Sequence, residues 1–377
     1  MGKTAAHVSK AFRRDTVPRR LRGAVILGIE TSCDETAAAV LRGRRILSSV
    51  VSTQTDVHAA FAGVVPELAS RAHLERLPTV LDRALSRAFG PKGRLRDLAS
   101  RVDAVAYTRG PGLAGALLVG KVAAQTLAEV HGLPLIGVNH LEAHALAGGL
   151  VRELRAPFLS LVVSGGHTEL VWVRRLGRYR VLGRTRDDAA GEVFDKVAKF
   201  LRLGYPGGPA VERAARRGDP RAVPLPRPTM PGTWDFSFSG LKTAVLYAVR
   251  DAGHADGERV RPAAPTSRPL PERFVADLCA SFQEAVVDTL VEKTLRAAAH
   301  AGVRRIALGG GVAANGPLRA RFARRAAEEG FDCVLPPLSL CTDNAAMVAH
   351  VAAQRFARGR LSPRLEVDPS LPIRSWA

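Results

Sequence analysis

The sequence predicts an α/β protein made of two related domains, and three observations lead to this fold class. The 377-residue chain is 46% hydrophobic, enough for a sizeable core, and its length suits two domains of roughly 150 residues each. Apolar runs typical of strands alternate with helical patterns along the chain. A strand, a polar turn and a second strand occur together twice, in residues 24–41 and again in residues 158–173.

Each element follows from the spacing of its apolar residues, short continuous or alternating runs for strands and a period of 3.6 for helices. In the first half we expect strands at 24–29, 37–41 and 102–107 and helices at 67–89 and 113–130. In the second half we expect strands at 158–163, 170–173 and 305–308 and helices at 191–203, 274–300 and 343–356. The segment near 252–271 is rich in Pro, Ala, Gly and charge, which predicts an exposed insert.

The chain is strongly basic, with 55 Lys and Arg against 35 Asp and Glu and a net charge of +20. This excess favours a polyanionic partner, nucleic acid first and an anionic membrane second, while a merely solvated arginine-rich surface is the alternative interpretation. No apolar run approaches the ~18 residues of a membrane span, because the longest, Gly112 to Ala128, is interrupted by Lys121. We therefore expect no association with the membrane interior.

The cysteines and the N-terminal residues indicate in which cellular compartment the protein is expected. The four cysteines form neither a CxxC pair nor a regular disulfide framework, which is typical of reduced thiols in a cytoplasmic protein. They are Cys33, Cys279, Cys333 and Cys341. Residues 1–22 contain seven Lys or Arg, one acidic residue and no apolar core, unlike a secretory signal. We expect residues 1–23 to form a disordered basic arm; an organellar transit peptide would have a similar composition.

The sharpest local pattern is His140-Leu141-Glu142-Ala143-His144. At ~100° per residue the two histidines lie about 40° apart on one helical face, which suits two ligands of one metal ion. Glu142 lies about 200° from His140, whereas zinc proteases need their glutamate near the metal. Asp343 is a candidate third ligand. The alternative interpretations are surface or capping histidines and, for Asp343, a helix N-cap.

Turns rich in glycine or small polar residues follow or bridge the predicted strands at 31–36, 109–112, 164–168 and 309–311. Glycine lets a ligand approach the backbone, and successive N–H groups bind phosphate oxygens. The chain has no P-loop and no dinucleotide fingerprint, yet several such turns in repeated units favour a nucleotide cleft between the domains. Phe236 to Thr243 combines two Phe, three hydroxyls and a Lys, which suits either a stacked base or ordinary packing at a strand end.

Taken together, these segments resemble one family closely. The matching stretches are residues 27–36, 63–71, 103–113, 140–144, 163–168, 187–196, 205–208, 236–243, 309–315 and 341–344. They are similar to the bacterial TsaD group (also called Gcp or YgjD), related to the archaeal and eukaryotic Kae proteins, which transfers threonylcarbamoyl to tRNA. The resemblance runs from about residue 25 to the end of the chain.

The resemblance implies an actin-like (ASKHA) fold, with two ribonuclease-H-like domains around a central cleft. It implies an N-terminal domain of residues 24–155 with 345–377 and a C-terminal domain of residues 156–344. In this family two histidines and a late aspartate hold one ion, which assigns His140, His144 and Asp343 as ligands, with iron (Fe²⁺) expected and zinc (Zn²⁺) also suited. The substrate-binding positions then correspond to Val162, Val163, Ser164, Gly165, Gly166, Asp195, Gly208, Glu212, Gly309, Gly310, Gly311 and Asn315.

The implied reaction transfers threonylcarbamoyl from threonylcarbamoyl-adenylate to N6 of the adenosine 3′ of the anticodon, in tRNAs reading codons that begin with A, and releases AMP. Asp34 and Glu35 are the candidate proton acceptors. The implied partners are the tRNA anticodon loop and the TsaB and TsaE subunits, with the helix at 67–89 as a docking surface for TsaB. The alternatives are a metal-dependent O-sialoglycoprotein endopeptidase, which the phase of Glu142 disfavours, and an ATP-binding kinase of the same fold.

Overall fold

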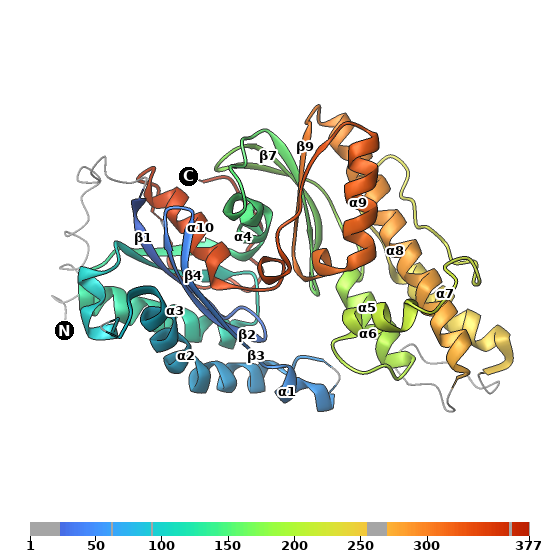
Figure 1. Ribbon diagram of the computed structural model, residues 1–377, viewed down its shortest axis with the longest axis horizontal. Coiled ribbons are helices and arrows are strands. Elements are labelled where there is room, and N and C mark those ends of the chain that lie inside the picture. Colours follow the sequence, from blue (N-terminus) through green and yellow to red (C-terminus); the bar gives the residue numbers. More distant parts are fainter. Residues whose placement is uncertain (1–22, 62, 92, 255–269, 362–363, 377) are drawn as a thin grey trace.

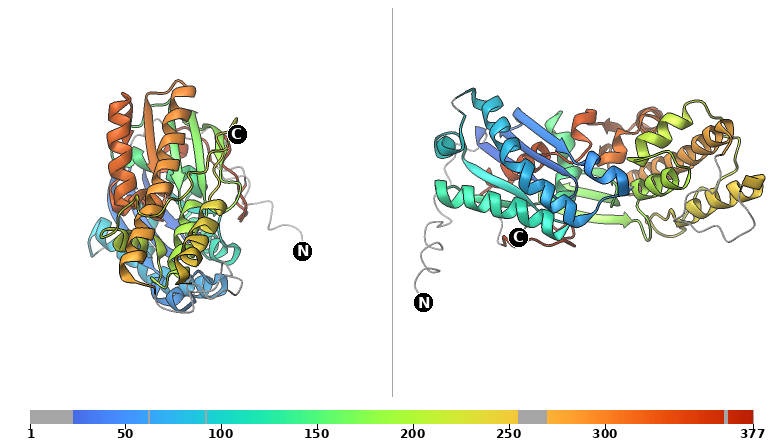
Figure 2. Two further views of the ribbon diagram at one scale, coloured as in Figure 1. Left: turned by 90° about the vertical axis from the view of Figure 1, so that its right-hand side faces the viewer. Right: turned by 90° about the horizontal axis from the view of Figure 1, so that it is seen from below.

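The structure, a computed structural model, describes residues 23–61, 63–91, 93–254, 270–361 and 364–376. Its framework is two five-stranded mixed sheets (Figure 1). The first half of the chain occupies one end of the molecule and most of the second half the other end (Figure 2). The residues 1–22 of the expected basic arm, and residues 255–269 of the expected insert, lie outside the described residues.

The two sheets repeat one topology. The first has the order β3-β2-β1-β4-β5, with strands β1 Val25–Glu30, β2 Glu35–Arg42, β3 Arg45–Thr53, β4 Ala104–Gly110 and β5 Leu135–Asn139. The second has the order β10-β9-β6-β7-β8, with strands β6 Phe158–Val163, β7 Thr168–Arg175, β8 Arg178–Arg184, β9 Arg305–Gly309 and β10 Asp332–Val334. In each sheet the first three strands pair antiparallel and the rest parallel. The repeated strand, turn and strand of the sequence is thus the start of each sheet.

Helices cover both faces of both sheets. The outer face of the first sheet packs against α2 Pro66–Phe89 and α3 Ala114–His131. The outer face of the second packs against helices that include α5 Ala190–Phe200, α7 Ser239–Val249, α8 Glu272–His300 and α9 Gly316–Glu328. Between the two sheets lie α4 His140–Leu146 and α10 Ala345–Phe356, which contact each other. A short helix, α6 Gly207–Ala215, packs on α5 and α8.

Alternation along β1 explains this layering. Leu27 and Ile29 are fully buried in the outer core against α2 and α3, while Ile26 faces the central core that α10 fills. A Cβ on Gly28 would lie 2.6 Å from the Ala345 carbonyl oxygen, so only glycine lets α10 approach β1 this closely. That approach places the start of α10 beside the start of α4.

The predicted strands and helices are confirmed, with ends shifted by a few residues. The four edge strands β3, β5, β8 and β10 and the helices α1 Thr55–His58, α6, α7 and α9 were not predicted. Helix α10 begins at Ala345 rather than residue 343, because the Asn344 side chain accepts a hydrogen bond from Met347 N and caps it. The N-cap interpretation of Asp343 is therefore wrong. In the expected insert, the described residues 252–254 end a short helical turn, Arg250–His254, that continues α7, and Ala252 is exposed.

The rings of Phe236 and Phe238 are fully buried and stacked with centroids 6.2 Å apart, so packing rather than base stacking is the role of these side chains. No helix in the described part of the chain combines the length and the apolar character needed to cross a membrane.

Candidate active site

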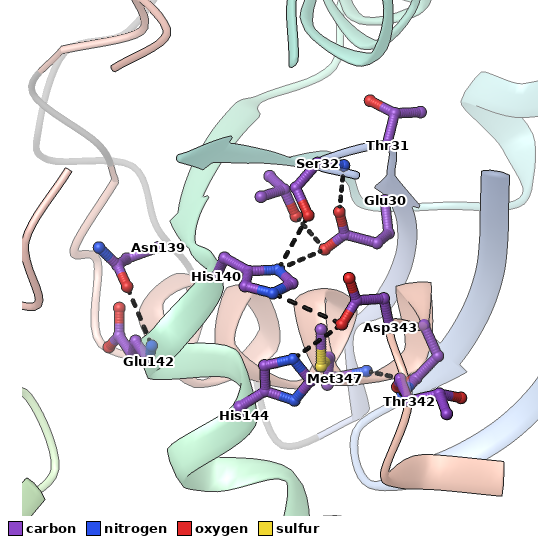
Figure 3. A network of polar contacts seen from close by, with 12 residues as sticks. Glu30, Thr31, Ser32, Asn139, His140, Glu142, His144, Thr342, Asp343 and Met347 are labelled. Carbon is purple, nitrogen blue, oxygen red and sulfur yellow. Dashed lines mark hydrogen bonds and ion pairs between the residues drawn. The ribbon is translucent and has the colours of Figure 1, made fainter. Parts of the chain in front are cut away.

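Helix α4 brings the two histidines together. The Asn139 side chain caps the helix by accepting a hydrogen bond from Glu142 N at 3.0 Å, which fixes where α4 begins. One turn then separates His140 from His144, whose ring centroids lie 4.6 Å apart. Asp343, from the loop before α10, places Oδ1 3.5 Å from His140 Nε2 and 3.0 Å from His144 Nε2 (Figure 3).

These three side chains fit a metal ion. Their ligand atoms lie within 4.8 Å of one another, and they are the one group of three or more His, Cys, Asp or Glu in the described ranges that meets this condition. Two imidazole nitrogens and one carboxylate oxygen suit Fe²⁺ or Zn²⁺. His144 is fully buried and its Nδ1 has no hydrogen-bond partner among the described residues. The arrangement predicted from spacing is therefore present in space.

A buried carboxylate behind His140 fixes its ring. Glu30 Oε2 lies 3.1 Å from His140 Nδ1, so that Nε2 is the nitrogen turned toward Asp343. Thr108 Oγ1 donates to Glu30 Oε2 at 2.6 Å and Ser32 N donates to Oε1 at 2.6 Å. A carboxylate bound to the far nitrogen of a ligand histidine sets its tautomer and orientation. Sequence reasoning missed Glu30, although a charge at the end of an apolar strand was a usable signal.

The charges of the cluster are coupled. Burial alone would lower the pKa of His140, but the Asp343 and Glu30 carboxylates outweigh it and raise that pKa to about 9. For Asp343, burial would raise the pKa, and the His140 and His144 rings hold it well below its usual range instead. Burial and the positive charge of His140 lower the pKa of His144. The Glu30 and Asp343 carboxylates thus make the space around the two histidines favourable for a cation.

Glu142 points away from the cluster (Figure 3). Its carboxylate pairs with Arg355 at 2.9 Å and accepts hydrogen bonds from Tyr179 and from Trp376. Because Glu142 lies ~200° around α4 from His140, its side chain forms structural contacts on the opposite side of the helix, as the sequence predicted. A glutamate so placed is no proton acceptor for chemistry at His140, which argues against a peptidase.

A cavity of about 580 Å³ opens beside the histidines and is lined by residues of both halves of the chain. Twelve of the predicted site residues line it: Asp34, Glu35, His140, Ser164, Gly165, Gly166, Asp195, Gly208, Glu212, Gly311, Asn315 and Asp343. The cavity joins the β1–β2 turn, the β6–β7 turn and the start of α6 in one space. The cleft predicted from the polar and glycine-bearing turns is therefore present.

The other predicted residues do not line this cavity; one of them is His144, which is fully buried behind it next to His140 and Asp343. Val162 and Val163 are fully buried strand residues whose side chains fill the cores. Gly309 and Gly310 serve close packing, because a Cβ there would lie 2.2 Å from the His144 carbonyl oxygen and 2.3 Å from that of Val163. These four positions shape the site through the backbone.

Three polar side chains from the second half of the chain line the cavity and are held in place. Asp195 Oδ1 accepts a hydrogen bond from Gly207 N at 2.7 Å, and burial raises the Asp195 pKa to about 6. Asn315 Nδ2 donates to Glu212 Oε2 at 3.1 Å, while Asn315 Oδ1 caps α9. Polar groups fixed in this way suit a ligand with several hydroxyl or amide groups.

The acidic residues of the β1–β2 turn are also in the cleft. Burial, together with the Asp343 and Asp34 carboxylates, raises the pKa of Glu35 well above its usual range. A raised pKa makes a carboxylate a stronger proton acceptor.

His167, which sequence reasoning did not single out, lines the same space. Burial and the neighbouring His140 and His144 lower its pKa to about 4, so it is neutral near pH 7. Its place in the Ser164 to Thr168 turn was the available signal.

Comparison with known proteins identifies the family. A model of the TsaD family, tRNA N6-adenosine threonylcarbamoyltransferase, matches residues 45–350. The chain belongs to the TsaD family. It is 53% identical to a tRNA N6-adenosine threonylcarbamoyltransferase of Anaeromyxobacter dehalogenans over 92% of this chain and 98% of that one. The enzyme of the same name from Geobacillus thermodenitrificans is 49% identical over 92% of this chain and 96% of that one.

Solved structures confirm the fold alone. Full-length HypF in a phosphate- and nucleotide-bound form superposes with a TM-score of 0.56 at 13% identity, over 89% of this chain and 56% of HypF. HypF from T. kodakarensis gives a TM-score of 0.54 at 14% identity, over 92% of this chain and 49% of HypF. This chain thus spans about half the length of these structures. Its fold is actin-like (ASKHA), as the resemblance implied.

Proposed function

We propose that this chain transfers threonylcarbamoyl from threonylcarbamoyl-adenylate to N6 of the adenosine immediately 3′ of the anticodon, in tRNAs that read codons beginning with A, and releases AMP. The observation that carries the proposal is that His140 and Asp343 line the same cavity as the Ser164–Gly166 turn, in a chain 53% identical to a transferase of that name. The donor is a mixed anhydride, so acyl transfer needs no further energy input. The acceptor amine is weakly nucleophilic, so rate must come from positioning and from polarising the carbonyl.

The proposed metal ligands are His140 Nε2, His144 Nε2 and an Asp343 oxygen, for one divalent ion per chain. Fe²⁺ is the first candidate and Zn²⁺ the second, since both accept this donor set. When bound, the ion supplies Lewis acidity toward the acyl donor. Glu30 keeps His140 Nε2 turned to the ligand side, as its 3.1 Å contact with Nδ1 requires.

The Ser164–Gly166 turn is the proposed cradle for the carbamoyl oxygen. Ser164 N donates to His167 O at 2.8 Å, whereas in the described residues the N–H groups of Gly165 and Gly166 have no partner. A Cβ at either glycine would meet no atom within 4 Å, so the space above them is open to a ligand. Two unpaired N–H groups in a cleft suit the charge that develops on a carbonyl oxygen during acyl transfer.

In the transfer, the N6 nitrogen forms a bond to the carbamoyl carbon, the bond from that carbon to the phosphate oxygen breaks, and AMP leaves with the electron pair. We assign the amine proton to Asp34 or Glu35, because both line the cavity and the pKa of Glu35 is raised. Full transfer by a Glu35→Ala variant would exclude Glu35. Asp195, Gly208, Glu212, Asn315 and Gly311 are the proposed contacts of the adenylate.

The two halves of the chain are the proposed domains, residues 24–155 with 345–377 and residues 156–344. The central position of α10, which packs on the first sheet, supports assigning the last segment to the first domain. We propose that the protein acts in the cytoplasm, where its tRNA substrate is expected.

TsaB and TsaE are the proposed partner subunits. The outer layer of the first domain exposes Leu74 on α2 and Leu118 and Val122 on α3, which are 63%, 48% and 51% accessible. Exposed apolar residues gathered on two contacting helices favour a protein interface. Loss of co-elution with TsaB on Leu74→Glu, with the exposed Arg83→Glu as the matched control on the same helix, tests this surface.

The direct experiment incubates the full chain with metal, threonylcarbamoyl-adenylate, unmodified tRNA and the partner subunits, and reads the nucleosides by mass spectrometry. We expect threonylcarbamoyladenosine to form and to be lost on His144→Ala. Peptide cleavage abolished by His140→Ala would instead support an endopeptidase, and metal-independent phosphoryl transfer to a sugar would support a kinase. No observation on the cleft favours either alternative.

A further inference from the structure

The edge of the second sheet carries an arginine-rich face that the proposed reaction does not use. Within residues 174–186 six exposed arginines lie on β7, on β8 and just after β8: Arg174, Arg175, Arg178, Arg180, Arg184 and Arg186. Arg186 pairs with Asp235. The other five form no ion pair with any residue in the described part of the chain. Arg184 lies opposite Glu169, beyond a bulge that puts it on the other side of the sheet from Arg180, so we call Arg174, Arg175, Arg178 and Arg180 the β8 arginine face.

One pair in this arrangement is unfavourable for the fold. The strand register places Arg178 directly opposite Arg175, and like charges directly opposite each other across a sheet are destabilising. Arg180 lies opposite Trp172, and the Arg174 guanidinium lies 5.2 Å from the centroid of the same ring. Several positive charges thus meet around one half-buried indole. Several exposed guanidinium groups at one hairpin, without an ion-pair partner in the described residues, favour a role in binding an anion.

The first sheet provides an internal comparison. Because the two sheets share one topology, β3 is the edge strand equivalent to β8. Its sequence, RILSSVVST, contains one arginine at its first position and then apolar and hydroxyl residues, whereas β8 reads RYRVLGR. The β2–β3 hairpin also carries exposed arginines, with Arg42 directly opposite Arg45, so the difference between the equivalent strands is the arginines that continue along β8 beyond the hairpin.

The face leads to the cleft. Strand β8 begins at its hairpin with β7 and ends at Arg184, which lies opposite Glu169. The next residue, Thr185, donates its N–H to Thr168 O, at the end of the turn that lines the cavity. Seven strand residues extend about 20 Å at ~3.3 Å each. Duplex nucleic acid presents one negative charge per ~1.7 Å of its axis, so the arginines at the hairpin end of β8 face several phosphates.

We propose that the β8 arginine face binds the phosphate backbone of the substrate tRNA outside the anticodon loop, while the loop enters the cleft. The inference rests on the proposed function, because it takes tRNA as the acceptor. The guanidinium fork matches phosphate oxygens in a bidentate manner. Contacts of this kind position the RNA without reading its sequence.

The test is tRNA binding by the full-length chain. The dissociation constant of an end-labelled tRNA transcript is measured by fluorescence anisotropy at several salt concentrations, for wild type, Arg178→Ala/Arg180→Ala and Arg178→Lys/Arg180→Lys. The matched control is Arg42→Ala/Arg45→Ala, an exposed arginine pair directly opposite each other on β2 and β3. It removes the same charge from the first sheet.

We expect the alanine pair to weaken binding about tenfold and to lower the salt slope by roughly 1.5, because each phosphate that an arginine neutralises accounts for ~0.7–0.9 of that slope. The lysine pair should restore most of the slope, because each ammonium still neutralises a phosphate. The control pair should bind as wild type does. All variants should melt as wild type does, since the substituted side chains are exposed.

Unchanged binding and slope in the alanine pair would overturn the inference, and so would an equal loss in the control pair, which would show a general effect of net charge. The transfer assay keeps the two proposals apart. The alanine pair should raise KM for tRNA and leave kcat unchanged. Absence of transfer by wild type would refute the proposed function, but it would leave the proposal that the β8 arginine face binds tRNA standing.

Discussion

Replacing Glu142 by alanine tests whether this glutamate stabilises the fold or takes part in the chemistry. The side chain is 1% exposed and lies on α4 between the two candidate ligand histidines. It receives Arg355 from α10, Tyr179 from β8 and Trp376 from the last residues of the chain. It therefore connects the central helices to the second sheet and to the C-terminus.

The magnitude follows from what the substitution leaves behind. Arg355, 13% exposed, would lose its carboxylate partner, and breaking a buried pair from one side costs about 3–5 kcal/mol. The Tyr179 hydroxyl and the Trp376 N–H would lose an acceptor as well. We expect Glu142→Ala to lower the free energy of unfolding by about 3–5 kcal/mol. Glu142→Gln should cost about half as much, because its amide oxygen still accepts both hydrogen bonds.

The assay is urea unfolding followed by circular dichroism, together with metal binding and transfer at a temperature where each variant is folded. Glu153→Ala, which removes an exposed carboxylate paired with Arg155, is the control and should unfold as wild type does. Folded Glu142→Gln should keep metal binding and most of its activity. Wild-type stability with complete loss of activity would refute the structural role of Glu142.

Two further predictions concern the cleft. Gly309→Ala should cost about 1–3 kcal/mol and weaken metal binding, because its Cβ would lie 2.2 Å from the His144 carbonyl oxygen, while Gly311→Ala meets nothing within 4 Å and should melt nearly as wild type does. Equal melting of the two variants would contradict this. Because burial raises the Asp195 pKa to about 6, the folded state holds a proton that the unfolded state has lost between about pH 4 and 6, and stability falls as pH rises through that window. Asp195→Asn should remove about 2–3 kcal/mol of this pH-dependent loss of stability. The measurement is the free energy of urea unfolding of wild type and variant across this pH range, and parallel pH profiles of the two proteins would refute the prediction.

The spacing of apolar residues along the chain was enough to predict much of the fold and the centre of the candidate site. The spacing of His140 and His144 needed only the geometry of one helical turn, and the same geometry turned Glu142 away. Strand β6 was predicted to the residue, because a continuous apolar run buried on both faces has few alternatives. Asp343 was one candidate for the third ligand until the family resemblance assigned it, because no local pattern connects it to α4.

Contacts between distant segments were beyond such reasoning. Glu30 reaches His140 across 110 residues of chain, and the pairing of β1 with β4 and of β4 with β5 brings them together. The edge strands β3 and β8 were missed because polar residues and arginines interrupt their apolar pattern. Phe236 and Phe238 looked suited to stacking a base, but the core takes both rings.

The central claim is that one metal ion binds between the α4 histidines and Asp343, and metal analysis of the full-length chain tests it most directly. Purified protein is loaded with Fe²⁺ without oxygen, or with Zn²⁺, and the bound metal is counted and examined by X-ray absorption. The account predicts one ion per chain with imidazole and carboxylate ligands, lost in His144→Ala and in Asp343→Ala but kept in His131→Ala, a histidine outside the cluster. Retention of the ion with unchanged affinity and spectrum by both cluster variants would contradict the claim.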